Sequence, residues 1–524
     1  MKYRNLFHSV IVMLCAAVAL AGCSNDETSQ TGKLQDKVMG TASTVTFSTE
    51  NSTTQATTMT RTSISHNINN GATPYWSAGD KIWVKDTDGN FKQSGVGTFN
   101  ADKTHGVFTL SGTFSNGCTV NYTGANGTAG DKVTIADKQT QTVPNDFSHA
   151  GVSGDCGTAT ASGTGNSFKF KLDHKASYLC FLPRSSSEYV HRSKLFKIEV
   201  ISEDAIAGTY DFSNGTLSNA PLDHASKTIT LTTGSGFPVT NTSTNINTNG
   251  AYMIIAPGTH SLTVRYWLRN TTDHPEGTIE GTITKYIDLT CEAGKIYDVT
   301  ANLEPQVLSS EYYMWDAKKE YWDGFKNVQP KDAGITNENY PKSQTSDPDR
   351  WHYTPATGVN WAANTAAQCP TINQIIWYTQ KGDPHWDGTE LWILLGRLRK
   401  GGMWLKKQDV IAAENHTTAQ KMYDAYNGTD YRNETNKFEE YSFNNNSIGK
   451  ERPEKSKIGN YFFLPAKGFY INGQFQYVGA LGYYWSATSS KHDPDHSFSL
   501  SFSSTSISLG CNYQFYGFSE ELKY

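Results

Sequence analysis

The chain has 524 residues, which is too long for a single hydrophobic core and predicts two or three domains. Its 45 basic and 50 acidic residues leave a net charge of -5, so the composition gives no indication of a nucleic acid or an anionic membrane surface as partner. Charged residues make up only 18% of the chain, while Thr, Ser, Gly and aromatic residues are frequent, and this balance is typical of an exported, β-rich protein.

The first 23 residues have the pattern of a secretion signal that ends in a lipid-attachment site. Lys2 and Arg4 precede an apolar run over residues 6–20 that is too short to span a bilayer. The following Leu-Ala-Gly-Cys23 resembles the lipobox of bacterial lipoproteins, which implies that Cys23 carries a lipid anchor; the alternative is an ordinary cleaved signal with a chance cysteine. Residues 24–27 are similar to the acidic signal that sends lipoproteins of Bacteroidetes to the outer face of the outer membrane. We therefore expect a cell-surface protein whose membrane contact is lipid alone.

Residues 24–44 are polar and predict a flexible tether. From 45 to 303, short runs of β-branched and aromatic residues alternate with turn clusters, and residues 168–172 (FKFKL) show the strict alternation of a half-buried strand. Helical periodicity is absent from this region of the sequence. The pattern predicts an all-β region, most simply two consecutive sandwiches. Strands are expected at 81–84, 106–111, 168–172, 176–182, 195–201, 227–232, 251–256, 261–268 and 281–289.

Five short segments of this region carry a family resemblance. They are 76–82 (WSAGDKI), 170–179 (FKLDHKASYL), 206–210 (IAGTY), 252–257 (YMIIAP) and 293–300 (AGKIYDVT). In order and spacing they resemble the fimbrillin-like lipoproteins of Bacteroidetes. The resemblance implies tandem transthyretin-like β-sandwiches, assembly into a fimbrium by donor-strand complementation, and other fimbrial subunits as partners.

The same resemblance implies a processing site at Arg61. In that family an N-terminal segment is removed after an arginine, and Arg61 is the first arginine after Arg4. A sheet that lacks one strand exposes unpaired N–H and C=O groups above an apolar groove, and an added strand satisfies both. A cut at Arg61 would remove the lipid and the first strand together. The alternative is an unprocessed arginine in a surface loop.

Residues 304–345 are turn-rich and predict a linker. Their aromatic residues between Tyr312 and Trp322 are too numerous for a free linker, so we expect them to pack onto one of the domains. From the linker onward the composition changes, because nine of the 12 tryptophans lie from Trp315 onward.

Residues 346–524 combine two predicted helices with a run of short strands. Thr371 is the expected N-cap of a helix that ends at Gly382, with Gln374 as its capping-box partner. A second helix is expected at 418–426, with Thr417 as its cap. Strands are expected at 461–464, 468–471, 482–487, 497–502 and 514–518.

Three segments of this region, 461–466 (YFFLPA), 482–488 (GYYWSAT) and 516–519 (YGFS), resemble the lectin-like domains of Bacteroidetes surface proteins. The resemblance implies an α+β C-type-lectin-like domain, distantly related to the formylglycine-generating-enzyme fold. Those enzymes use a pair of neighbouring cysteines at the end of the domain, whereas Cys511 stands alone here. The fold is therefore expected to carry over without the catalysis.

The sequence contains no motif of a hydrolase, a metalloprotease, a P-loop or a dinucleotide site. Two clusters, 383–387 (DPHWD) and 492–496 (HDPDH), have side chains that could contact a metal, but a solvated turn is the preferred interpretation of each. We therefore expect a non-enzymatic protein with no catalytic residue, no cofactor and no metal. An enzyme that uses the lectin-like fold remains as a third alternative.

Trp404 and Trp386 are the first candidates for ligand binding, because they lie among Gly, Asp and Lys. Lys406 and Lys407 next to Trp404 could hold an anionic sugar while the indole stacks on its ring. The alternative is a solvated basic face above a structural tryptophan. Trp377 and Trp485 lie in apolar runs and are expected in the core.

Six cysteines remain beyond Cys23, widely spaced, and they are either disulfides or inert buried thiols. A disulfide between Cys369 and Cys511 is expected, because export is oxidising and the lectin-like fold brings the start of its first helix beside a late strand.

The leading functional hypothesis is a surface lipoprotein that serves as an accessory or tip subunit of a fimbrium and adheres to a glycan or a host surface through its C-terminal domain. A chain that ends inside a folded module is expected to accept a strand without donating one. The alternative is a monomeric, lipid-anchored glycan-binding protein that does not polymerise.

Overall fold

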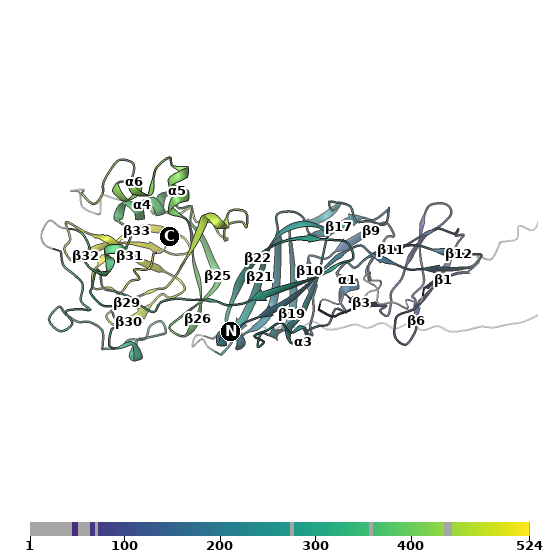
Figure 1. Ribbon diagram of the computed structural model, residues 1–524, viewed down its shortest axis with the longest axis horizontal. Coiled ribbons are helices and arrows are strands. Elements are labelled where there is room, and N and C mark those ends of the chain that lie inside the picture. Colours follow the sequence, from purple (N-terminus) through teal and green to yellow (C-terminus); the bar gives the residue numbers. More distant parts are fainter. Residues whose placement is uncertain are drawn as a thin grey trace, which may run out of the picture. The chain divides into compact units, whose positions relative to one another are not determined.

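The computed structural model describes residues 44–50, 63–68, 72–272, 277–355, 360–433 and 443–522. Strands are four times as frequent as helices, at 44% against 10%, and the helices are short, so the predicted mostly-β fold is confirmed (Figure 1). Both Cys23 and Arg61 lie outside the described residues. Within these ranges no helix combines the length and the apolar character needed to cross a membrane.

Two five-stranded sheets form the N-terminal sandwich. Both contribute to one aromatic core, in which Phe47 and Phe108 from one sheet meet Val84 and Tyr122 from the other. The first sheet has the order β12-β13-β1-β7-β6 and contains β1 (Thr44–Thr49), β6 (Thr98–Phe99), β7 (Gly106–Ser111), β12 (Ser162–Thr164) and β13 (Ser167–Phe170). The second has the order β14-β11-β8-β4-β5 and contains β4 (Trp83–Lys85), β5 (Phe91–Gln93), β8 (Thr119–Tyr122), β11 (Gly157–Thr160) and β14 (Asp173–His174).

The second sandwich is built on four long strands. Ile198, Leu231 and Val264 point from them into a core that Phe181 and Met253 complete from the opposite sheet. The long strands are β16 (Lys194–Ser202), β19 (Thr228–Pro238), β21 (Gly258–Asn270) and β22 (Ile279–Cys291), with β10 (Lys138–Thr140) at the edge. The opposite sheet is β20 (Ala251–Ile255), β15 (Ser177–Arg184) and β23 (Ile296–Asn302). Smaller elements are β2 (Ser63–His66), β3 (Ala72–Tyr75), β9 (Lys132–Ile135), β17 (Ala207–Asp211), β18 (Asp223–Ser226), α1 (Ala150–Ser153), α2 (Glu188–His191) and α3 (Ile246–Asn249).

The long sheet continues into the C-terminal module. β22 pairs in parallel with β25 (His385–Leu394) at one register pair, Thr282↔Glu390, and β26 (Arg397–Lys406) and β28 (Tyr461–Pro465) follow. Gly281 permits this approach, since a Cβ atom there would lie 2.5 Å from the carbonyl oxygen of Thr389. β24 (Gln306–Val307) also pairs in parallel with β25, at Trp392 and Ile393.

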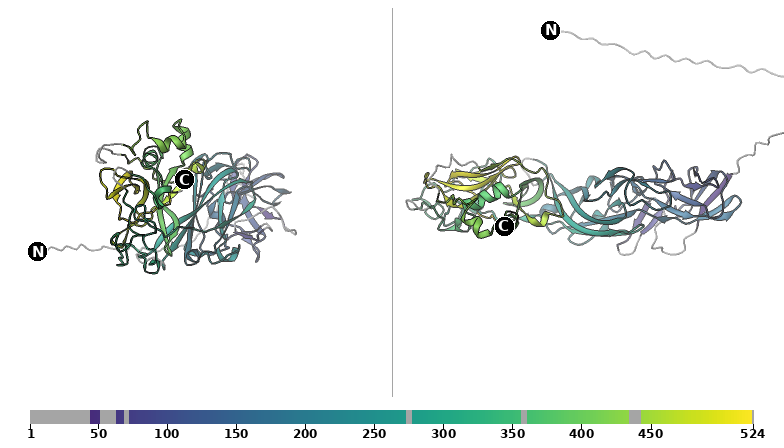
Figure 2. Two further views of the ribbon diagram at one scale, coloured as in Figure 1. Left: turned by 60° about the vertical axis from the view of Figure 1, so that its left-hand side comes forward. Right: turned by 90° about the horizontal axis from the view of Figure 1, so that it is seen from above.

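The core of the C-terminal module lies between helices and a four-stranded sheet of order β27-β33-β32-β31. Ile375 and Ile376 of α4 pack with Leu500 and Leu509 of the sheet. Figure 2 shows the longer helices of the chain gathered beside these strands. The elements are α4 (Ile372–Lys381), α5 (Gln408–Glu414), α6 (Ala419–Asp424), β27 (Asn444–Asn445), β29 (Phe469–Ile471), β30 (Gln474–Gln476), β31 (Gly482–Ser489), β32 (His496–Phe502) and β33 (Ile507–Tyr513).

The sequence predicted several of these elements and missed others. Thr371 caps α4 with Gln374 as its partner, as predicted, whereas α6 is capped by Thr418 instead of Thr417. The predicted strand at 514–518 is wrong: the buried side chain of Gln514 bonds to the carbonyl of His496, and the chain turns there. β25, β26 and α5 were not expected.

The aromatic residues of the predicted linker belong to the C-terminal module. Tyr312 and Trp322 are buried with Tyr470 and Phe475 in one apolar cluster, and Trp315 donates its indole N–H to the carbonyl of Ser486 at 2.8 Å. Residues 312–322 therefore pack onto a domain, as expected, and form part of its interior.

Candidate functional site

The strand β1 lies in the middle of its sheet, between β7 and β13. It pairs antiparallel with β7 over residues 44–48 and parallel with β13 over residues 46–49. Its side chains alternate, so that Val45, Phe47 and Thr49 are buried while the intervening residues face outward. β1 contains no charged residue, and it is therefore held by backbone hydrogen bonds and apolar packing.

The floor beneath β1 is aromatic. The ring of Phe47 stacks on Phe168 with centroids 4.9 Å apart and meets the edge of Phe114 at 5.2 Å. Phe108 of β7 is fully buried in the same cluster. Without β1, this floor would be open between two strands that each lack a partner on that side.

The chain passes from one sandwich to the other between β1 and β2. Whereas β1 belongs to the N-terminal sandwich, Ile64 of β2 is buried in the core of the second and bridges to Phe147. His66 Nε2 lies 2.7 Å from Asp298 Oδ1, which fixes β2 further. Arg61 precedes β2 directly in the sequence. A break after Arg61 would leave β1 in its sheet without a covalent link, while the remaining chain would begin next to an anchored strand.

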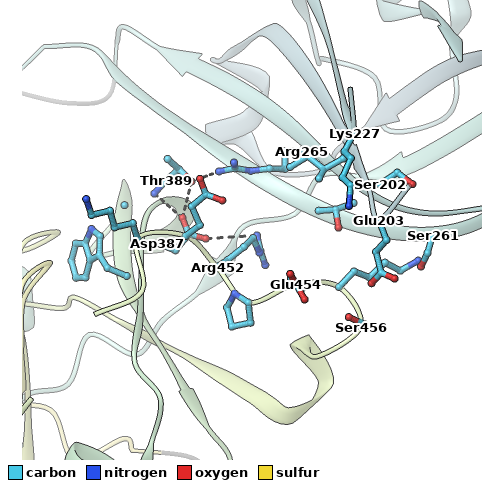
Figure 3. Close-up of a pocket in the computed structure, with 18 of the residues that line it drawn as sticks. Ser202, Glu203, Lys227, Ser261, Arg265, Asp387, Thr389, Arg452, Glu454 and Ser456 are labelled. Atoms are coloured by element: carbon cyan, nitrogen blue, oxygen red, sulfur yellow. Dashed lines mark hydrogen bonds and ion pairs between the residues drawn. The ribbon is translucent and has the colours of Figure 1, made fainter. Parts of the chain in front are cut away.

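A cleft of about 700 Å³ lies between the outward face of β21 and the C-terminal module (Figure 3). Arg265 and Trp267 line it from β21, and Trp386 and Asp387 line it from the start of β25. Residues 450–456 form a further wall, and residues 201–203 and Lys227 of the second sandwich line the cleft as well. No motif in the sequence indicates Arg265, Trp267 or Arg452 as site residues. Alternation along β21 is the available signal, but it does not tell which face a second domain covers.

Two arginines of the cleft are bound to neighbouring residues. Arg265 pairs with Glu199 at 3.1 Å and donates to the hydroxyl of Thr389 at 2.7 Å. Arg452 pairs with Glu390 at 3.0 Å and lies 3.7 Å from Asp387. These ion pairs are nearly buried, and each lies within one domain. The hydrogen bonds from Arg265 to Thr389 and from Arg452 to Thr284 join the second sandwich to the C-terminal module.

The surroundings shift the pKa of both carboxyl groups. Burial raises the pKa of Glu390 to about 7, although Arg452 opposes the shift. Burial also acts on Asp387, but Arg452 and hydrogen bonds from Thr389 outweigh it and hold the pKa of Asp387 below its usual value. Asp387 is therefore the permanent anion of the pair, and Glu390 titrates near neutral pH.

The segment 450–457 is tied to β22 as well. Arg452 bonds to the hydroxyl of Thr284, and Lys455 donates to the carbonyl of Ile287 at 2.7 Å and pairs with Asp288 at 2.6 Å. The cleft thus has polar walls in which the two arginines and Lys455 are held by neighbouring residues. Such a cleft can bind a polar ligand by shape.

The predicted ligand-binding residues are not brought together at one site. Trp386 lines the cleft, half-buried, with its edge toward Phe502. Trp404 is also half-buried, because Arg452 lies over its ring at 4.9 Å and Phe463 packs against it at 5.1 Å. Arg452 thus makes a cation–π contact with Trp404 within the protein.

The two lysines are engaged in local contacts. Lys406 Nζ pairs with Glu414 at 2.8 Å and lies 3.5 Å from Asp383. Lys407 Nζ donates to the carbonyl of Gly459 at 2.7 Å. Neither lies against Trp404 as a ready anion site. Trp485 and Trp377, expected in the core, are indeed buried.

The predicted disulfide between Cys369 and Cys511 is not formed in the structure. Cys369 is buried among Trp315, Trp485 and Phe518, with its sulfur toward the carbonyl of Glu520, whereas Cys511 packs on the α4 side of the sheet. Because the two thiols belong to different apolar clusters, the sheet separates them. The six cysteines of the described chain are free.

Among the described residues, one group has the composition of a metal site. The ligand atoms of His66, Cys180 and Asp298 lie within 4.8 Å of one another. Burial and the neighbouring Asp298 raise the pKa of Cys180, which favours a neutral thiol, and His66 already bonds to Asp298. This geometry is that of a buried hydrogen-bonded group.

No family model and no curated protein matches the chain. Three solved structures from Bacteroides to which it is similar are a candidate cell adhesion protein from Bacteroides ovatus (15% identity, 49% of this chain and 92% of that chain, TM-score 0.32), another from Bacteroides uniformis (16%, 50% and 94%, 0.27) and a fimbrial protein from Bacteroides ovatus (12%, 88% and 97%, 0.23). At these identities and TM-scores, the role of this chain has to be inferred from its own residues.

Proposed function

We propose that this protein is a non-enzymatic surface adhesion subunit that accepts a donated strand into the place of β1. The observation that carries the proposal is the position of β1: it is a central strand, and its covalent link to the remaining chain runs through the segment that contains Arg61. Removal of a central strand opens a groove with unpaired backbone on both sides, which is the geometry that strand addition requires.

The proposal orders the events on the cell surface. The precursor is held by lipid on Cys23 at the outer membrane, and β1 fills its own groove. Cleavage after Arg61 separates the anchor and β1 from the rest of the chain. An extended segment of another fimbrial subunit then replaces β1. Since β1 carries no charge, the replacement leaves no buried ion without a partner.

We also propose that the subunit accepts a strand without donating one from its C-terminal residues. β33 is paired with β27 and β32, and Phe518 and Leu522 are buried beyond it. Releasing these residues would expose the core of the C-terminal module. An accessory or tip position, with the lectin-like C-terminal module turned to a glycan or host surface, agrees with this packing.

Strand exchange can be tested with purified protein. A soluble Cys23→Ser chain is cut with an arginine-specific protease and mixed with a fluorescent peptide of residues 43–50. The cut protein is expected to bind the peptide, whereas the uncut protein is expected not to bind it. Fluorescence anisotropy measures the binding. A Phe47→Asp peptide is the matched control and should not bind, because it would bury an unpaired charge. Equal binding of the two peptides, or binding to the uncut protein, would contradict the proposal.

The cellular test uses the processing site itself. An Arg61→Ala chain should stay lipid-anchored and absent from the high-mass ladder that fimbrial polymers give on a gel. If the variant still enters the ladder, processing at Arg61 is not required.

A second candidate function rests on another observation. In the intact chain β1 already completes its sheet, so the uncleaved protein has no open groove. This state suits a monomeric, lipid-anchored glycan-binding protein that does not polymerise. This second function would be favoured if isolated surface material gave no ladder of high-mass polymers on a gel and the isolated protein kept its N-terminal segment.

A further inference from the structure

An aromatic surface on the C-terminal module is distinct from the cleft and from the predicted tryptophans. It consists of six rings, which we call the tyrosine platform: Phe469, Tyr477, Tyr483, Tyr513, Phe515 and Tyr516. They come from β29, from the chain after β30, from β31, and from β33 with the turn that follows it.

The rings form a continuous row. Phe469 stacks on Tyr477 with centroids 5.8 Å apart and lies 6.1 Å from Tyr516, which lies 5.8 Å from Tyr513. Tyr483 and Phe515 flank the row, at 4.8 Å from Phe469 and 5.1 Å from Tyr516. A row of four rings is longer than a single sugar ring.

The tyrosine platform rests on buried aromatic residues, and its outer face is exposed to solvent. Phe518, fully buried, contacts Phe469, Tyr483 and Tyr516 and stacks on the buried Trp485 at 4.2 Å. By contrast, Tyr477 is 53% exposed and Tyr513 is 43% exposed. Large apolar side chains that remain exposed together on a fixed base are typical of a binding surface.

The hydroxyl groups of the platform are available. Within the described chain, the four tyrosine hydroxyls make no hydrogen bond. Burial, together with the neighbouring tyrosines, raises the pKa of Tyr483 and that of Tyr516, so these hydroxyls stay protonated and can donate as well as accept. The six side chains carry no formal charge.

The backbone at one end of the row is unusual. Tyr477 has φ +54°, a left-handed conformation that bulky residues rarely adopt, and its carbonyl accepts N–H groups from Ala480 and Leu481 in a tight turn. The turn sets the tyrosine beside Phe469. A strained conformation kept at an exposed aromatic residue is more often found at functional sites than elsewhere.

We propose that the tyrosine platform binds a neutral carbohydrate chain, with the apolar faces of successive sugar rings on the aromatic row and their hydroxyls on the tyrosine hydroxyls. This proposal rests on the adhesive role proposed above and names the class of its ligand. Neutrality follows from the platform itself, because an anionic sugar would find no cation among these six side chains.

The test is affinity electrophoresis of the soluble Cys23→Ser chain through gels that contain one polysaccharide each: glycogen, xylan, mannan or a β-glucan as neutral probes, and hyaluronan or heparin as anionic ones. At least one neutral polysaccharide should retard the protein. Tyr477→Ala and Tyr513→Ala should each weaken the retardation about tenfold or more, in the range of aromatic contact residues. Tyr477→Phe and Tyr513→Phe keep the rings and should weaken it less.

Tyr423→Ala is the matched control, since Tyr423 is 39% exposed but lies on α6 with Arg432 against its ring. It should leave the retardation unchanged. Thermal melting of each variant distinguishes a loss of binding from a loss of folding. Because Tyr513 lies on the surface, the Tyr513→Ala variant is expected to fold normally. No retardation by any neutral polysaccharide, equal retardation of the alanine variants, or retardation by the anionic gels alone would each overturn the proposal. Binding of the 43–50 peptide is independent of the platform, so its outcome tests the strand-accepting role separately.

Discussion

Two segments of this protein dock onto a β-sheet in opposite ways. β1 is held by backbone hydrogen bonds on both sides and by apolar side chains, with no charge in the strand. The segment 450–457 is held on β22 and β25 by ion pairs of Lys455 with Asp288 and of Arg452 with Glu390, and by a hydrogen bond from Arg452 to Thr284. The backbone ladder of the first can be reproduced by many sequences, whereas the second depends on particular side chains.

The difference teaches which contacts can be exchanged. A strand recognised by its backbone and by alternating apolar residues can be replaced by a similar strand from another chain. A segment recognised by buried ion pairs cannot, because a substitute would leave charges unpaired. The N-terminal groove is thus suited to assembly, and the joint between the second sandwich and the C-terminal module is suited to permanence.

The largest effect is expected at Phe47. Phe47→Ala should destabilise the N-terminal sandwich by about 3 to 5 kcal/mol, because a fully buried ring is lost between Phe168 and Phe114. Phe47→Leu, which keeps an apolar side chain, should cost under about 1.5 kcal/mol. Chemical denaturation measures both. If Phe47→Leu destabilised the protein as much as Phe47→Ala, the groove would require the specific shape of the phenylalanine ring. The contrast between β1 and the segment 450–457 would then fail.

The next effect is expected at Arg452. Arg452→Ala should cost about 2 to 3 kcal/mol, since it leaves Asp387 buried without its counter-ion. Arg452→Lys should cost nearly as much, because an ammonium group cannot reproduce the spread of contacts to Glu390, Thr284 and the Trp404 ring. The measurement is denaturant unfolding, with the exposed Lys457→Ala as control. Full rescue by lysine would mean that charge alone holds the joint.

A smaller effect is expected from pH at Glu390. Its pKa is raised from 4.5 in the unfolded chain to about 7 in the folded protein. Between these values the folded state keeps a proton that the unfolded state has released, so the joint is most stable below pH 4.5 in this respect and loses stability as the pH rises toward 7.

Glu390→Gln should flatten that pH dependence, and the exposed Glu454→Gln should not. Unfolding followed by tryptophan fluorescence over this pH range is the measurement. A slope that persists in Glu390→Gln would assign the titration to another group.

The smallest effect is expected at Lys455. Its partner Asp288 is exposed, so Lys455→Ala should change global stability little. It should raise hydrogen exchange of residues 450–457, and high salt should erase the difference from the unmodified protein. Unchanged exchange would show that Arg452 alone fixes the segment.

The sequence predicts those features whose causes are local. The alternation of apolar and polar residues predicted the strand that the structure has at Ser167–Phe170. The Thr371–Gln374 capping box predicted the start of α4. Features that depend on distant partners were missed. Trp404 was expected to be exposed because its neighbours are Gly and Lys, yet Arg452 covers it. Arg452 itself stands in a charged run that is typical of a solvated loop, and only the fold brings it to Glu390 and Asp387.

The same limit applies to the tyrosine platform. Its six rings come from four stretches of chain, and those stretches contain buried aromatic residues as well, such as Phe518 and Trp485. Composition cannot distinguish a ring in the core from a ring on the surface. Similarly, the pairing of β22 with β25 requires a glycine at position 281, because a side chain there would collide with Thr389. The sequence alone does not show that Thr389 lies beside Gly281.

The central position of β1 also bears on how the assembly would carry load. β1 has four register pairs with β13 and five with β7. A donated strand in this position, pulled along its own axis by a tethered cell, would have to shear both ladders together instead of opening them one bond at a time. Rupture under force follows the unfolding rate and not the equilibrium affinity. The grip of one subunit on the next would then be set by the direction of the pull, and a fibre in flowing liquid would be strongest along its length.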